Sequence, residues 1–186
     1  MSEGKFYIRR YRLNDGKVVD LDGKDLSLED DFGHVFYKSL TGVNSRGEQK
    51  GMYVETYPEC DSARIWLSSV PHESQTSSVL ALYVFGASPD TTVTASSLSV
   101  TEMILKMEES WHELYDKLEC CFILWHDDFR QRKALYYVKG AAEPKSDVIK
   151  GIPYLHCEIT LTNVFGKTFS LGDNTIEDWL INGGLD

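Results

Sequence analysis

The strongest constraint on the fold is a single amphipathic helix, which the sequence predicts over residues 100–118. Ser99 and Glu102 match a capping box, in which two side chains satisfy backbone N–H groups of the first turn. Leaving the apolar side in water would forfeit roughly 1.5–3 kcal/mol per large side chain, so the helix must pack on a sheet or a partner. The packing residues recur at three- and four-residue steps: Met103, Ile104, Met107, Trp111, Leu114, Tyr115 and Leu118.

Strands are predicted on both sides of this helix. Residues 77–85 precede it and are rich in Val, Leu, Tyr and Phe, which favours a central strand. Residues 120–126 and 132–139 follow it, joined by a charged turn. Residues 154–164 alternate apolar and polar positions, which predicts one buried face and one solvated face.

The N-terminal half predicts further short strands separated by turns. An Asp15-Gly16 turn supplies the positive-φ positions of a tight hairpin. Polar or glycine-bearing loops are expected at residues 41–51, 71–76, 86–97 and 143–151. The predicted strands of this half cover residues 6–13, 17–21, 32–40, 52–57 and 63–69.

Many short strands, one long helix and no βαβ alternation predict a mainly β fold of the α+β class. We expect an antiparallel β-sandwich or barrel with a flanking helix, and a short C-terminal helix that Asn174 can cap. We expect a single domain over 1–186. Within it, residues 1–50 would form an N-terminal hairpin or arm, residues 52–170 the sandwich core with its helix, and residues 171–186 the C-terminal helix and tail.

Charge and hydropathy limit the partners. The formal net charge is −10 and the pI about 4.9, which argues against a nucleic-acid-binding surface, because phosphate recognition needs clustered Lys and Arg. The N-terminus lacks the apolar region of a signal peptide, and no apolar run approaches the roughly 18 residues of a membrane span. We therefore expect a chain made in the cytoplasm with no membrane partner.

Residues capable of chemistry are few. His126, Asp127 and Asp128, together with His156 or Asp147, could hold a divalent metal for a hydrolase, but a charged turn between two strands is the simpler interpretation. Cys120 or Cys121 could pair with a histidine as nucleophile and base, but both open an apolar strand where burial raises a thiol pKa. No P-loop, G-x-G-x-x-G or G-x-S-x-G motif is present. We expect no enzyme, no catalytic residue, no metal and no cofactor.

Aromatic residues on predicted strands leave two interpretations open. They could form a carbohydrate platform, or they could belong to the core and to subunit interfaces. The aromatic residues considered for the platform are Tyr53, Tyr57, Trp66, Tyr83, Trp125, Tyr136 and Tyr137. We take Tyr53, Tyr57, Trp66 and Trp179 as the candidate interface residues.

The order of elements from residue 78 to about 170 resembles a known family. The residues that carry the likeness are the acidic turn at Trp125–Asp128, the Tyr-rich strand at Tyr136–Glu143 and the Thr-alternating strand at Ile159–Phe165. In this pattern the chain resembles bacteriophage tail proteins, specifically the distal-tail (baseplate hub) proteins of long-tailed phages and their tail-tube relatives.

The resemblance implies a virion component of the phage tail. Copies of such a β-sandwich assemble into a ring, commonly a hexamer, around the DNA conduit, and the ring joins the tail tube to the tip or to adjacent tail proteins. No catalytic residue carries over from the family. The alternatives are a carbohydrate- or receptor-binding β-sandwich module and, less favoured, a metal-dependent hydrolase.

Overall fold

A computed structural model describes residues 6–15, 17–43, 46, 49–56, 63–73, 75–88 and 98–182. The helices are α1 (Leu28–Asp31), α2 (Val100–Leu118) and α3 (Thr175–Ile181). The strands of the first half are β1 (Phe6–Asn14), β2 (Lys17–Asp20), β3 (Leu26–Ser27), β4 (Val35–Thr41), β5 (Gln49–Thr56), β6 (Ala63–Glu73) and β7 (Thr76–Phe85). Those of the second half are β8 (Phe122–Asp127), β9 (Arg132–Ala141), β10 (Lys145–Ile149), β11 (Ile152–Asn163) and β12 (Phe169–Ser170).

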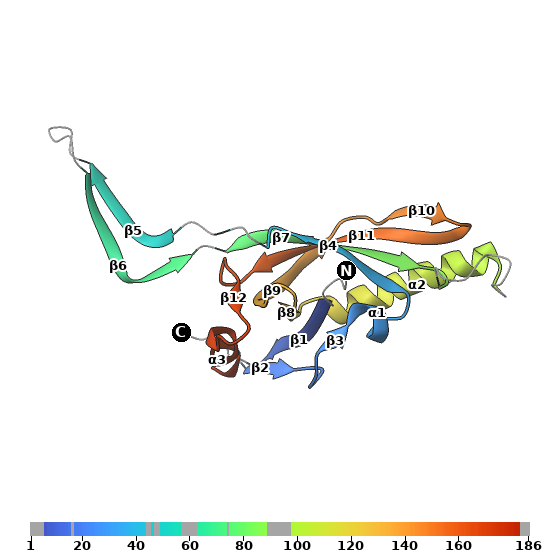
Figure 1. Ribbon diagram of the computed structural model, residues 1–186, viewed down its shortest axis with the longest axis horizontal. Coiled ribbons are helices and arrows are strands. Elements are labelled where there is room, and N and C mark those ends of the chain that lie inside the picture. The colour runs from blue at the N-terminus through green and yellow to red at the C-terminus, as the bar shows by residue number, and fades with distance from the viewer. Residues whose placement is uncertain are drawn as a thin grey trace.

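Most strands belong to one antiparallel sheet. Its path runs β2-β1-β8-β9-β11-β7-β4, with β10 paired to β11, β12 to β9 and β3 to β1 (Figure 1). The longest register joins β11 to β7, from Tyr154 opposite Phe85 to Asn163 opposite Thr76. The predicted fold class, mainly β with a long helix and a short C-terminal helix (α+β), is confirmed.

Helix α2 packs on the inner face of this sheet, against β7 and β11. Its boundaries and its Ser99–Glu102 capping box match the sequence prediction. Tyr115 is half-buried against the core, whereas Ile104, expected on the packing side, is instead 39% exposed. A helix ridge meets a flat sheet over a narrow stripe, so a residue at the border of the apolar side stays in water. The fully packed residues of the helix are Met103, Met107, Trp111, Leu114 and Leu118.

One continuous core joins the helix to both ends of the sheet path. Ile8 of β1 and Val35 of β4 belong to the same cluster, although their strands lie far apart along that path. The β11 residues predicted to face inward are buried: Leu155, Cys157, Ile159 and Leu161. No helix in the described part of the chain is long and apolar enough to cross a bilayer.

The outer face of β8 and β9 is covered by α3. Ile176 and Leu180 pack on Leu135 and Phe169 in a cluster separate from the main core. Lys133, only 4% exposed, donates to the Glu177 carboxylate at 2.6 Å and fastens the helix to β9. These contacts cover the outer face around Lys133 and Leu135, whereas Tyr137 farther along β9 is 38% exposed.

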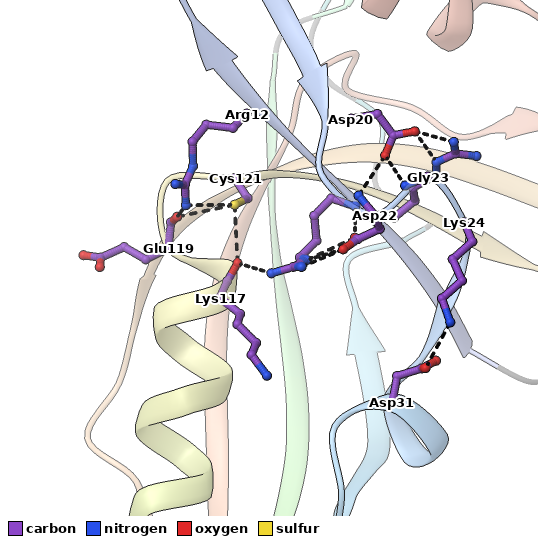
Figure 2. A network of polar contacts seen from close by, with 11 residues as sticks. Arg12, Asp20, Asp22, Gly23, Lys24, Asp31, Lys117, Glu119 and Cys121 are labelled. Atoms are coloured by element: carbon purple, nitrogen blue, oxygen red, sulfur yellow. Dashed lines mark hydrogen bonds and ion pairs between the residues drawn. The ribbon is translucent and has the colours of Figure 1, made fainter.

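Arginines of β1 tie the N-terminal hairpin to the end of α2 (Figure 2). The Arg10 guanidinium donates to the Asp22 carboxylate at 2.6 Å and to the Lys117 carbonyl at 2.9 Å. Arg12 donates to the Glu119 carbonyl at 3.3 Å. The sequence suggested a hairpin or arm within residues 1–50, but these contacts and the pairing of β1 with β8 place the β1–β2 hairpin in the main sheet.

The element that leaves the body is the β5–β6 hairpin. These two strands form their own two-stranded sheet, and they extend well beyond the main sheet on the side where β4 ends and β7 begins (Figure 1). Their register places Tyr53 opposite Trp66 and Met52 opposite Leu67. β6 continues through Pro71 to Glu73, so part of the loop expected at 71–76 is a strand.

Candidate interaction surfaces

The His126-Asp127-Asp128 segment is a structural turn. The Asp127 carboxylate accepts backbone N–H groups of Phe129 at 2.9 Å and Arg130 at 3.1 Å, which closes the turn between β8 and β9. The His126 ring stacks on Tyr7 at 4.9 Å between ring centroids. Its Nε2 lies 3.6 Å from Asp128 Oδ1, at a carboxylate whose side chain is 57% exposed. These contacts give His126, Asp127 and Asp128 structural roles at the end of β8, which accounts for their grouping there.

The structure does not gather the other acids and imidazoles considered as metal ligands. Asp147 contacts the Tyr154 hydroxyl at 3.4 Å, and His156 Nε2 lies 3.4 Å from Lys38 Nζ. Within the described ranges, no group of three or more His, Cys, Asp or Glu residues is placed to hold a metal ion.

Of the buried cysteines in the described part of the chain, Cys157 has surroundings that favour the neutral thiol. Burial raises the pKa of the Cys157 thiol to about 12. Cys121 is fully buried, and its thiol donates to the carbonyls of Lys117 and Glu119 at 3.4 Å each. Cys120 is exposed at a left-handed backbone position (φ 58°) between α2 and β8. A cysteine nucleophile reacts as the thiolate, which burial disfavours at Cys157. Cys157 is therefore a packing residue of the core.

The predicted aromatic platform divides into several environments. Trp125 is 2% exposed and Tyr136 is fully buried, so both belong to the core, which contradicts their place in a platform. Tyr137 is 38% exposed beside Phe122. Trp179 is half-buried against Phe122 and Phe165, where it secures α3. The side chains of Tyr53 and Trp66, and the whole of Tyr57, lie outside the described residues, as do residues 89–97 of the loop predicted at 86–97.

One aromatic surface does exist, on the outer face of β4, β7 and β11, and we call it the tyrosine face: Phe36, Tyr83, Tyr154 and His156. Phe36 lies opposite Tyr83, and Tyr83 opposite His156, so a single row crosses three strands. The Tyr83 and Tyr154 rings meet edge to face at 5.5 Å. All four side chains are half-buried, and Phe36, Tyr83 and Tyr154 pack against a buried cluster that contains Phe85.

Charged side chains surround the tyrosine face. Lys38 holds its Nζ over the Tyr83 ring at 5.3 Å from the centroid. On β10, Lys145 lies opposite His156 of β11 and Asp147 lies opposite Tyr154 of β11. Glu158 Oε1 lies 3.9 Å from His156 Nε2. The sequence pattern placed His156 on the solvated side of β11. It gave no sign that Tyr154 and His156 meet Tyr83 and Phe36, because strand order and register decide that.

Comparisons with known proteins give a likeness among solved structures only. No protein-family model matches the chain, and a search of curated proteins found no match. Among solved structures, the chain is similar to a chain of the phage p2 baseplate in its activated conformation with Sr, with 10% sequence identity and a TM-score of 0.46. The aligned region covers 87% of this chain and 45% of that chain, so this chain spans less than half the length of the baseplate chain.

Proposed function

We propose that this chain is a non-enzymatic structural component of a phage tail, which assembles with copies of itself into a ring and joins adjacent tail proteins. The observation that carries the proposal is the β5–β6 hairpin, whose described residues pair only with each other and extend away from the main sheet (Figure 1). The resemblance of residues 78–170 to distal-tail and tail-tube proteins supplies the class of assembly.

An isolated two-stranded hairpin is at best marginally stable in water, because it has no third strand or helix to bury its side chains. The register pairs apolar residue types at successive positions: Met52 with Leu67, Tyr53 with Trp66 and Val54 with Ile65. Since successive residues of a strand alternate between its two faces, apolar positions fall on both faces of the hairpin. A neighbouring molecule that covers both faces would stabilise it.

The groups that could perform chemistry support a structural role. The Asp127 carboxylate closes a turn, Cys157 is buried as a neutral thiol, and Arg10 pairs with Asp22 and joins the N-terminal hairpin to the Lys117 carbonyl of α2. A subunit with net charge −10 also repels the DNA backbone, so the lumen of such a ring would let DNA pass without binding it.

The test is removal of the hairpin. Thr41 at the end of β4 lies opposite Val79 of β7, so a short turn can join these two neighbouring strands in place of residues 45–74. We expect the full chain to form rings in negative-stain images and a multimer by light scattering at high concentration, and the shortened chain to stay monomeric with an unchanged melting temperature.

A matched pair of point variants refines this experiment. Trp66→Ser changes an apolar register position and should reduce assembly, whereas Arg64→Gln, opposite Glu55, should leave it intact. A full chain that stays monomeric at every concentration, and that is absent from purified virions, would refute the proposed function.

A further inference from the structure

The tyrosine face is an unusual use of the solvated side of an antiparallel sheet. Such a side is normally polar, because only the other side builds the core. Here the core cluster takes the inward residues of β7 and β11, among them Leu82, Val84 and Cys157. The outward positions Tyr83 and Tyr154 pack against a second, smaller buried cluster around Phe85, and like His156 they keep part of each ring exposed.

The rings form one continuous aromatic surface. The centroid of the Tyr83 ring lies 5.5 Å from that of Tyr154 and 5.6 Å from that of His156. The Phe85 and Tyr154 rings stack with their centroids 5.2 Å apart. Phe36 meets Phe85 edge to face at 5.5 Å. Each ring is held by another ring, so the surface is preorganised and would lose little side-chain entropy when a ligand binds.

The rim charges select the class of ligand. Two ammonium groups, Lys38 and Lys145, are balanced by two carboxylates, Asp147 and Glu158. A balanced rim does not attract a polyanion such as nucleic acid, for which clustered positive charge is required. It does present donors and acceptors side by side, together with the tyrosine hydroxyls, at the edge of the rings.

We propose that the tyrosine face binds a neutral carbohydrate. A neutral sugar ring has an apolar C–H side that can cover an aromatic ring, and each of its hydroxyls both donates and accepts hydrogen bonds. Aromatic rings surrounded by mixed donors and acceptors match that chemistry. Tyr154 provides the stacking surface, Tyr83 supports it edge to face under the Lys38 ammonium, and Asp147 and Lys38 engage hydroxyls. This site is independent of the β5–β6 hairpin and of the proposed ring.

The experiment titrates full-length protein with maltohexaose, cellohexaose and chitohexaose, and follows binding by calorimetry and by NMR shifts. We expect saturable binding of at least one hexasaccharide. Tyr154→Ala should weaken it at least tenfold, and Tyr154→Phe, which keeps the ring, should weaken it less. Asp147→Asn changes an exposed rim residue and keeps an oxygen that can accept from the Tyr154 hydroxyl, and it should weaken binding several-fold in a protein with a wild-type melting curve.

Phe129→Ala is the matched control, because Phe129 is 79% exposed on the β8–β9 turn and lies outside the face. It should bind as the wild type does. No binding of any of the three sugars would overturn the proposal, and so would equal loss in the Phe129 variant. A change of oligomeric state in Tyr154→Ala without sugar binding would instead show that the face contacts a second copy, which also overturns it.

Discussion

Gly86 is the position where a single methyl group should be most damaging. It follows β7 directly, and a Cβ built on it would lie 2.2 Å from the Met103 carbonyl oxygen and 2.7 Å from its carbonyl carbon, in the first turns of α2. Contacts of a real Cβ essentially never fall below 3.0 Å, so Gly86→Ala requires the helix and strand to separate by at least 0.8 Å (3.0 minus 2.2).

This separation would loosen a packed contact. Met103 is fully buried beside Phe85 and Ile152, and overpacking of this kind costs about 1–3 kcal/mol. We therefore expect Gly86→Ala to lower the free energy of unfolding by about 2 kcal/mol, measured by urea denaturation followed by circular dichroism.

Gly140→Ala is the matched control. Gly140 lies in β9, where an added Cβ meets nothing within 4 Å, so this variant should unfold within about 0.5 kcal/mol of wild type. If Gly86→Ala has the same urea midpoint as Gly140→Ala, then α2 does not rest against the end of β7, and the packing argument is refuted.

Three further perturbations test other contacts. Asp22→Ala removes the partner of Arg10 from a site where the aspartate side chain is 5% exposed, and it should cost about 2–3 kcal/mol in the same denaturation assay. Ser99→Ala removes the helix cap and should cost about 1 kcal/mol; an unchanged urea midpoint would contradict the cap. Burial raises the pKa of Tyr136 and of Cys157 to about 12, from ordinary values of 10.0 and 9.0, so both groups stabilise the fold only while neutral. The melting temperature should hold below about pH 9 and fall as the pH rises toward 12, and a flat profile there would contradict this.

Local signals explain what the sequence could predict. The bounds of α2 follow from a capping box and from apolar residues at helical spacing, and both signals lie within the helix itself. The buried side of β11 follows from strict alternation over its length. Neither inference depends on which other strand lies beside the element.

Elements without a local signal were missed. β10, with sequence KSDVI, lies in the polar segment 143–151 that we predict as a loop, and all five of its residues are exposed. It becomes a strand because Lys145–Ile149 pair with the start of β11. The short strands β3 and β12 likewise exist through pairing with β1 and β9. Pairing of this kind is a tertiary effect that propensity does not contain.

The tyrosine face shows the same limit at a candidate site. Tyr83 and His156 lie 73 positions apart in the sequence (156 minus 83), and only the β7–β11 register brings them together. Lys38 falls at a register irregularity between Tyr37 and Ser39 of β4, and its Nζ lies over the Tyr83 ring. A β-bulge redirects side chains, and no pattern in residues 35–41 predicts where it falls.

The connection between β4 and β7 is longer than the main sheet requires. These strands are direct neighbours, with Thr41 opposite Val79, so the sheet needs only a short turn between them. The chain instead inserts the β5–β6 hairpin, which adds no pairing to the main sheet. Ordering those residues costs roughly 1–2 kcal/mol per residue in backbone entropy, and a two-stranded hairpin recovers little of that alone. Under the proposed function, contacts outside the chain supply the difference, so the hairpin sequence would be constrained by a partner, whereas the sheet is constrained by its own core.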